Sequence, residues 1–154
     1  MSIYRAEIVW TQTSGDFLLN RYSRAHVWRF DGGIEVPASS SPQVVRLPFS
    51  SAEAVDPEEA FVASLASCHM LCFLHLAAKR KFIVERYVDE AVGEMALDER
   101  GREWMARVVL HPRAEFAGAS VPSFEILNAI HHAAHEECFI ANSVKTDVIC
   151  EAVL

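Results

Sequence analysis

The feature that most constrains the fold is a long run without a formal charge, Ala60–Ala78. It follows the acidic start Asp56-Pro57-Glu58-Glu59 and ends at Lys79-Arg80-Lys81. Asp56 suits the N-cap of a helix and Pro57 its first residue, while acidic residues favour the first turn and basic residues the last. The sequence therefore predicts a helix from Pro57 to about Lys81 that is apolar on nearly all sides.

A helix of this kind lies either in a membrane or at the centre of a protein or dimer. Polar side chains dilute this one, and the sequence holds only one such segment. We therefore expect a soluble protein without a membrane span. Residues 1–7 have neither a basic n-region nor an apolar h-region, so the cytoplasm is the expected location. The diluting residues are Ser64, Ser67, Cys68, His69 and His75.

Alternating or β-prone segments surround the predicted helix, and turn residues separate them. Asp98-Glu99-Arg100-Gly101-Arg102 is typical of a hairpin turn, and Ser120-Val121-Pro122 opens a second helix that reaches Cys138. The order is βββ-α-ββ-α-β, which predicts one α+β domain over residues 1–154. The predicted strands are Ile3–Trp10, Arg24–Phe30, Ile34–Pro37, Tyr87–Leu97, Glu103–Pro112 and Val144–Leu154.

Charge and cysteine usage narrow the functional class. The formal net charge is −7 and the longest basic run has only three residues, so a nucleic-acid partner is not expected. Four cysteines without an export signal argue against a framework of structural disulfides. Cys68 and Cys72 lie one helical turn apart, with β-carbons about 6 Å apart where a disulfide needs about 3.8 Å. Cys72 and Cys150 are interpreted as core residues.

Cys68 has more informative surroundings. It follows Glu58 by ten positions along the predicted helix, and Cys138 closes the second helix just before the last strand. Pro57-Glu58, a run of small and apolar residues and then Cys68 resemble the osmotically inducible protein C (OsmC) and organic hydroperoxide resistance (Ohr) family. The resemblance spans nearly the whole chain. Two departures, Phe139 where the family usually has proline and a bulkier strand Arg24–Phe30, indicate an atypical OsmC-like branch.

This resemblance implies an OsmC-like fold, with antiparallel sheets around long central helices in an intertwined homodimer. It also implies a cysteine-based peroxidase that acts in defence against oxidative stress. Organic hydroperoxides are its expected substrates, and hydrogen peroxide is the second candidate. Cys68 would attack the peroxide and Cys138 would resolve the product. Arg21 with Glu58 would activate the thiol, and Arg24 is the reserve for Arg21. A dithiol reductant, which in the hydroperoxide branch is a lipoylated protein, would restore the enzyme. No cofactor or metal is implied.

Such a set of residues has a physical rationale. The thiolate attacks a peroxide, but a free cysteine with a pKa of about 8.5 is mostly protonated at neutral pH, and burial worsens this. A guanidinium nearby stabilises the thiolate, and a carboxylate orients the guanidinium through a bidentate pair. The sulfenic acid formed at Cys68 must then be trapped before over-oxidation, which a disulfide with Cys138 achieves.

The helical spacing leaves two arrangements open. Ten residues of a straight helix place Glu58 about 15 Å from Cys68 along the axis, which a carboxylate cannot bridge. Either the helix breaks between them, or an arginine bound to Glu58 reaches the thiol of another subunit.

Three other classes are weighed against the peroxidase. His131, His132, His135 and Cys138, together with Cys68 and Cys72, have Cys and His side chains that a zinc site uses. However, the spacing spreads them around the helix and no Cys-x-x-Cys pair is present. His69 beside Cys68 could suggest a hydrolase, but adjacent helical residues point about 100° apart. A small-ligand binder or scaffold without peroxidase turnover is the third alternative.

Overall fold

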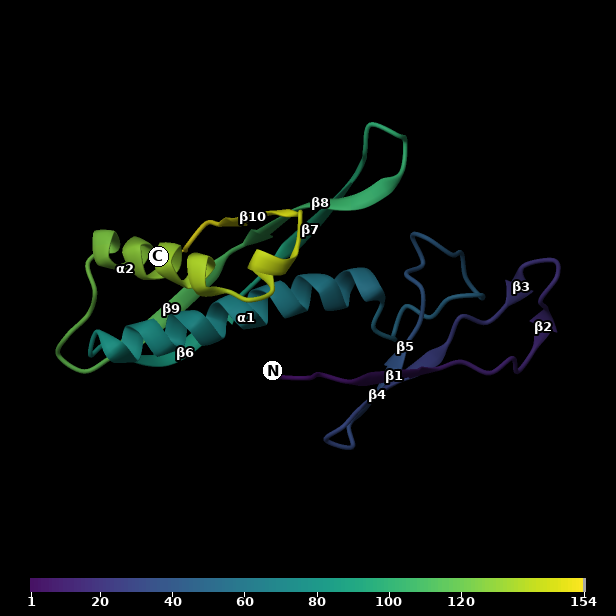
Figure 1. The fold of residues 1–154 in the computed structure, drawn as a ribbon, viewed down its shortest axis with the longest axis horizontal. Helices are drawn as coiled ribbons and strands as arrows, with labels where there is room; N and C mark the ends of the chain where they lie inside the picture. Colours follow the sequence, from purple (N-terminus) through teal and green to yellow (C-terminus); the bar gives the residue numbers. More distant parts are fainter. Residues whose placement is uncertain (154) are drawn as a thin grey trace. The chain divides into compact units, whose positions relative to one another are not determined.

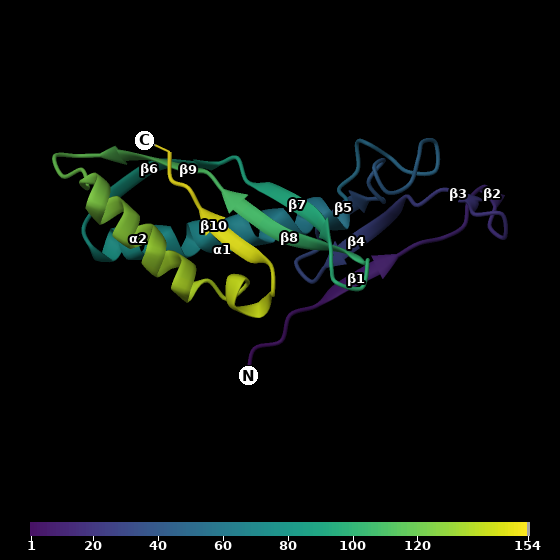
Figure 2. The ribbon, with the colours of Figure 1, turned by 90° about the horizontal axis from the view of Figure 1, so that it is seen from above.

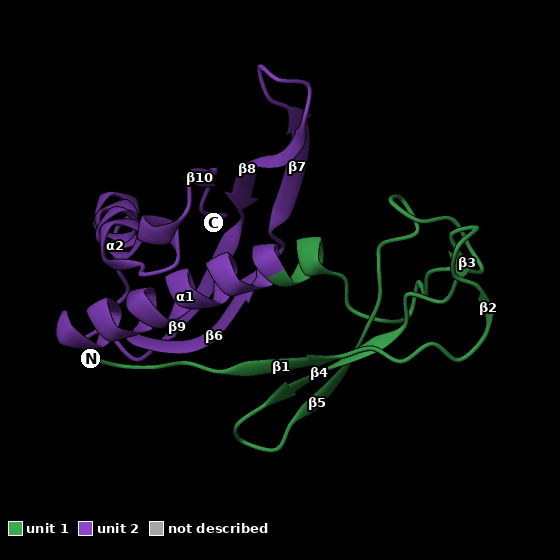
Figure 3. Ribbon diagram, turned by 45° about the vertical axis from the view of Figure 1, so that its right-hand side comes forward, with its two compact units in different colours: residues 1–60 green, residues 61–154 purple. Residues whose placement is uncertain are grey.

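The computed structural model of the chain describes residues 1–153, which form β-strands before, between and after two long helices (Figure 1). The α+β class is therefore confirmed. The chain divides into two compact units, Met1–Ala60 and Phe61–Leu154 (Figure 3). The single domain expected over residues 1–154 stays a prediction.

The first unit contains a three-stranded antiparallel sheet and a two-stranded hairpin. The sheet has the order β1-β4-β5, and β1 aligns Ile8 with Trp28 of β4. The hairpin of β2 and β3 was not predicted. It depends on Gly15, where φ is +88° and a Cβ would lie 1.9 Å from the carbonyl oxygen of Arg21. The strands are β1 (Ala6–Val9), β2 (Gly15–Asp16), β3 (Arg21–Tyr22), β4 (His26–Phe30) and β5 (Glu35–Ala38).

Helix α1 spans Pro57–Lys79, close to the predicted bounds. Its start is fixed by a reciprocal cap, in which Asp56 Oδ1 accepts a hydrogen bond from the Glu59 N–H at 2.8 Å. In return, Glu59 Oε2 accepts one from the Asp56 N–H at 3.3 Å. Both contacts satisfy donors that a helix N-terminus otherwise leaves without partners.

We expect Asp56→Ala to lower the free energy of unfolding by about 0.5–2 kcal/mol, because the helix start loses its buried cap. Urea denaturation followed by circular dichroism would measure the change. Glu53→Ala, at an exposed position just before the cap, is the matched control and should leave stability within about 0.5 kcal/mol. Equal losses from the two variants would contradict the capping role.

The second unit contains most of α1, a second helix and five strands, in two sheets. The C-terminal strand β10 pairs in parallel with β8, and β8 pairs antiparallel with β7 (Figure 2). Strands β6 and β9 form a separate antiparallel pair. The elements are β6 (Ile83–Asp89), β7 (Val92–Leu97), β8 (Glu103–Leu110), β9 (Pro112–Ala117), α2 (Phe124–Glu137), the 3-10 helix η1 (Ala141–Ser143) and β10 (Asp147–Cys150).

The chain forms four strands between the two helices, β6 to β9, where the sequence predicted two. Tyr87–Leu97 and Glu103–Pro112 were each expected to form one strand, but the chain bends between β6 and β7 and again at His111. The two bends are joined, since Asp89 Oδ1 accepts a hydrogen bond from the His111 N–H at 2.8 Å. The predicted turn between β7 and β8 is confirmed. There Asp98 Oδ1 accepts from the N–H groups of Arg100 and Arg102.

Two buried clusters make the core of the second unit. The first joins both helices to β6 and β9 through Phe73, Leu76 and Ala77 of α1 and Leu127, Ile130 and Ala134 of α2. The second joins Leu65 of α1 to Val108 and Leu110 of β8. Helix α1 therefore contributes to both clusters, as expected of a central helix.

Much of α1 nevertheless stays uncovered within one chain. Its best 18-residue window has a mean hydropathy of 1.7, and only 28% of that window is buried. By length and composition alone, this is the one helix of residues 1–153 that could cross a membrane, a criterion that core helices also meet. Leu71 on this helix is 60% exposed.

Candidate active site

The thiol of Cys68 lies on α1 between two other thiols. It is half-buried and lies close enough to Cys72 and to Cys138 to raise the pKa of both. Cys72 lies one turn further along the same helix, as its spacing predicted. Cys138 comes from the end of α2, so the structure brings together the two thiols that the resemblance paired.

The position of Cys138 is set by the end of α2. It is the C-cap residue, and its backbone N–H donates to the carbonyl of His135. Its side chain is 1% exposed, and Sγ accepts a hydrogen bond from the Ala141 N–H at 3.4 Å. The next residue, Phe139, is 78% exposed. Phe139 is the position at which the family usually has proline. In this chain, the hydrogen bond from the Ala141 N–H holds the Cys138 thiol in its buried position.

Burial has a direct electrostatic consequence for these thiols. It raises the pKa of Cys138 to about 11, and the neighbouring Cys68 adds to the effect. Burial also raises the pKa of Cys72, with a further contribution from Cys68. Both flanking groups are therefore neutral thiols at pH 7, because a low-dielectric surrounding penalises the thiolate.

The other site residues expected from the resemblance belong to the first unit. Arg21 is exposed on β3, and Glu58 is half-buried in the first turn of α1. Within this unit, neither side chain forms a salt bridge with a residue that the structure describes. The expected pair between Arg21 and Glu58 is therefore not formed within one chain.

Arg24, the reserve candidate, is already engaged. Its guanidinium donates to Asn20 Oδ1 at 2.6 Å and to the backbone carbonyl oxygens of Asn20 and Tyr22. It also lies over the ring of Tyr22, with Cζ 3.7 Å from the ring centroid. These contacts hold a local turn, which leaves Arg21 as the stronger candidate of the two.

Helix α1 continues without a break from Pro57 to Lys79. Of the two arrangements that the spacing left open, the broken helix is therefore excluded. Glu58 and Cys68 remain about 15 Å apart along one axis.

A group of buried polar side chains, not grouped by the sequence, lies beside these thiols in the second unit. His69 Nε2 of α1 lies 3.0 Å from His131 Nδ1 of α2, and Cys150 Sγ of β10 lies 3.7 Å from His69 Nε2. We call these three residues the His-His-Cys cluster. The two imidazoles are stacked, with ring planes 4° apart, and are 1% and 4% exposed.

Burial keeps the His-His-Cys cluster uncharged. It lowers the pKa of His69 and of His131 to about 4 each, and each is lowered further by another imidazole, His135 and His69 respectively. Burial raises the pKa of Cys150 to about 12, followed by the effects of Asp89 and Glu151. Two neutral imidazoles and a thiol therefore meet in the protein interior.

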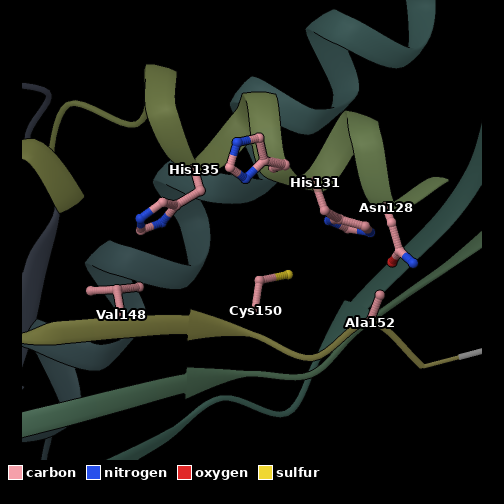
Figure 4. A pocket seen from close by; sticks show the side chains of 7 residues that line it. Asn128, His131, His135, Val148, Cys150 and Ala152 are labelled. Carbon is pink, nitrogen blue, oxygen red and sulfur yellow. The ribbon is translucent and has the colours of Figure 1, made fainter. Parts of the chain in front are cut away.

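A pocket of about 290 Å³ opens beside the His-His-Cys cluster, between α2 and the segment from Val148 to Ala152. Figure 4 shows His131 and His135 projecting from α2 toward the strand that carries Cys150. The pocket wall consists of Asn128, His131, His132, His135, Val148, Cys150 and Ala152.

The structure separates the residues that the sequence had grouped as a metal alternative. His131 is buried, whereas His132 is exposed and pairs with Glu136 at 3.5 Å. Cys138 neighbours Cys68, and it is not one of the three residues whose donor atoms converge around the imidazoles. No spacing in the sequence could have joined His69, His131 and Cys150, because they come from three different elements.

The sequence matches the model of one protein family, OsmC-like protein, over residues 50–152. This chain is a member of the OsmC-like family. The expected OsmC-like fold is confirmed with it, while the homodimer stays a prediction. A search of curated protein sequences finds no match.

Solved structures agree with the family assignment. An OsmC-like protein of unknown function from Vibrio cholerae is 50% identical, with a TM-score of 0.97 over 99% of this chain and 100% of that one. An organic hydroperoxide resistance protein of Bacillus subtilis is 20% identical, with a TM-score of 0.65 over 99% and 100%. Another from Elizabethkingia anophelis is 17% identical, with a TM-score of 0.67 over 98% and 95%. At these lower identities the OsmC-like chain shares the fold.

Proposed function

We propose that this OsmC-like protein is a cytoplasmic cysteine-based peroxidase that reduces organic hydroperoxides in defence against oxidative stress. The observation that carries the proposal is the pairing of Cys68 on α1 with Cys138 at the end of α2. The shared fold with proteins named for organic hydroperoxide resistance supports it.

In the first step, the Cys68 thiolate attacks the outer oxygen of the hydroperoxide. The O–O bond breaks, the sulfur is oxidised to sulfenic acid, and the alkoxide takes up a proton to leave as the alcohol. A cation beside the sulfur would favour both the thiolate and the departing alkoxide. Arg21 is the candidate for that cation.

In the second step, Cys138 condenses with the sulfenic acid. The S–S bond forms, and the sulfenic hydroxyl leaves as water with the proton of the Cys138 thiol. The raised pKa of Cys138 suits this order, because the thiol keeps its proton until Cys68 has been oxidised. An external dithiol, such as a lipoylated protein, then reduces the disulfide by thiol–disulfide exchange and is itself oxidised to a disulfide.

A homodimer would complete the site and cover the open apolar surface. Large apolar side chains are exposed on the first unit, and Leu71 is exposed on α1. The unbroken helix keeps Glu58 away from the Cys68 of its own chain. We therefore place Arg21 and Glu58 of one subunit beside Cys68 of the other. The exposed residues of the first unit include Ile8, Phe17, Leu18 and Leu19.

Mixing subunits tests this shared site. Cys68→Ser and Arg21→Met each inactivate the homodimer, but a heterodimer of the two should regain one intact site and about half of the wild-type activity per dimer. The measurement is hydroperoxide consumption by tagged heterodimers after co-expression.

Mixing Cys68→Ser with Arg24→Met is the matched control. Because Arg24→Met alone should stay active, this heterodimer is expected to keep about half of the activity as well. A Cys68→Ser and Arg21→Met heterodimer without activity would reject the shared site.

The reaction itself is tested by mass spectrometry of the reduced protein after one equivalent of an organic hydroperoxide such as cumene hydroperoxide. A peroxidase of the proposed kind shows a peptide in which Cys68 is linked to Cys138. A ligand-binding or scaffold protein stays reduced under the same treatment, which would overturn the proposal. A link between Cys68 and Cys72 would instead reject Cys138 as the resolving thiol.

A further inference from the structure

Buried polar atoms without partners gather around the His-His-Cys cluster. Residues 1–153 contain five buried side-chain nitrogen or oxygen atoms without a hydrogen-bond partner. Two of them are the outer ring nitrogens of the cluster, His69 Nδ1 and His131 Nε2. Two more belong to Tyr87 and Asp89 of β6. Both lie near Cys150, because Asp89 raises the pKa of Cys150 and Cys150 raises the pKa of Tyr87. Buried polar groups are usually satisfied, so this part of the interior is unusually polar. The two nitrogens that face each other, His69 Nε2 and His131 Nδ1, are the other nitrogens of the same rings.

The spacing of the donor atoms points to an ion. One donor atom from each member of the His-His-Cys cluster lies within 4.8 Å of the other two. Zn²⁺ lies about 2.0–2.1 Å from an imidazole nitrogen and about 2.3 Å from a thiolate sulfur. A tetrahedral centre therefore separates two nitrogens by about 3.4 Å, and nitrogen from sulfur by about 3.6 Å. The observed separations of 3.0 Å and 3.7 Å need only a small adjustment.

We propose that His69 Nε2, His131 Nδ1 and Cys150 Sγ form a binding site for Zn²⁺. On binding, the proton between the two imidazoles moves to the outer nitrogen of its own ring, so both rings bind the ion as neutral imidazoles through the nitrogens that face each other. The thiol of Cys150 loses its proton to solvent. Two imidazoles and one thiolate form a ligand set that suits Zn²⁺, whereas harder ions such as Mg²⁺ prefer oxygen.

The surroundings favour a cation with one open coordination position. The carboxylates of Asp89 and Glu151 are close enough to Cys150 to act on its charge, so a dication meets a negative field. The pocket of about 290 Å³ reaches His131 and Cys150 from outside. Water or a small ligand in that pocket would supply the fourth donor, and His135 in its wall is the protein alternative.

The proposed zinc site is distinct from the thiol pair. Cys68 and His69 are adjacent on α1, but adjacent helical residues point about 100° apart. Cys68 contacts Cys72 and Cys138, whereas His69 contacts His131 and Cys150. The site therefore uses neither of the cysteines that the proposed peroxidase reaction oxidises.

Cobalt substitution tests the site. The full-length protein is reduced, stripped of metal with a chelator and titrated with Co²⁺. We expect one equivalent per chain, with a thiolate-to-metal charge-transfer band and the intense visible bands of a tetrahedral centre. Zn²⁺ should displace Co²⁺ and remove both. Thermal unfolding should shift upward in excess Zn²⁺, because an ion that binds only the folded state stabilises it.

Variants assign the ligands. Cys150→Ala should abolish the charge-transfer band and weaken Zn²⁺ binding more than about ten-fold, since even outer partners of a metal contribute that much. His131→Gln should also weaken Zn²⁺ binding. The matched controls are Cys72→Ala, which removes another half-buried thiol, and His132→Gln, which removes an exposed neighbour on α2. Both controls should bind Co²⁺ as the wild type does.

The Cys68→Ser and Cys150→Ala variants distinguish metal binding at the His-His-Cys cluster from metal binding at the other thiols. A Cys68→Ser protein that keeps the Co²⁺ spectrum supports the site independently of any peroxidase activity. Loss of the band in Cys68→Ser with retention in Cys150→Ala would place the metal on the other thiols and overturn the proposal. So would a wild-type protein that shows no charge-transfer band and no upward shift with Zn²⁺. The shift with Zn²⁺ should persist in Cys72→Ala and vanish in Cys150→Ala even if the latter is less stable.

Discussion

Cys68→Ser should reduce the rate of hydroperoxide consumption by at least about 10³-fold, because loss of a nucleophile removes the chemical step itself. A serine hydroxyl at the same place is nearly isosteric, but it cannot form a sulfenic acid. The fold should persist, since Cys68 is only half-buried. Consumption of cumene hydroperoxide in the presence of excess dithiol would measure the loss.

Cys138→Ser should behave differently from Cys68→Ser. One equivalent of peroxide per chain should be consumed rapidly, after which Cys68 remains as sulfenic acid and is oxidised further to sulfinic acid. Mass spectrometry would show the added oxygen atoms on Cys68. Cys72→Ala is the matched control, because this thiol also neighbours Cys68 and should be dispensable for turnover. Equal, mild losses in Cys68→Ser and Cys138→Ser would contradict the division of roles.

Phe73→Ala should lower the free energy of unfolding by about 3–5 kcal/mol, the usual cost of truncating a buried aromatic side chain. Phe73 is fully buried on α1, with its ring centroid 4.3 Å from that of His131 and 5.5 Å from that of Tyr87. Neither neighbour can fill the space without losing its own packing. Urea denaturation at fixed protein concentration would measure the change.

Leu97→Ala is the matched control for this core substitution. Leu97 ends β7 and is 66% exposed, so its truncation should change stability by less than about 0.5 kcal/mol. A loss of under about 1 kcal/mol in Phe73→Ala would contradict the view that this cluster holds α1 against α2.

Helix α1 could be predicted from sequence because its signals are local. The cap at Asp56, the proline after it and the uncharged run up to Lys79 all lie within the helix or next to it. The bends that divide the strands could not be predicted in this way. They depend on Asp89 bonding the backbone N–H of His111, a contact between positions far apart in the chain.

The two groups of side chains in the second unit differ in the same respect. The Cys68 and Cys138 pair was expected because a family resemblance supplied the link between two helices. The His-His-Cys cluster has no such guide. The sequence connected His131 only with its own helix and the thiols, and His69 only with Cys68, and Cys150 was interpreted as a core residue. Only the packing of α1, α2 and β10 together shows that their donor atoms converge.

The parallel pairing of β10 with β8 has a consequence for the order of assembly. Asp147 aligns with Arg107, and the chain between these two strands contains β9, α2 and η1. Parallel strands joined across such a distance are slow to form, because the entropy of closing a long loop opposes them until the pairing is nearly complete. The β7–β8 hairpin has no such delay. Cys138 and Cys150 both lie in the part of the chain that arrives last, so a nascent or refolding chain exposes Cys68 and His69 before either has its partner.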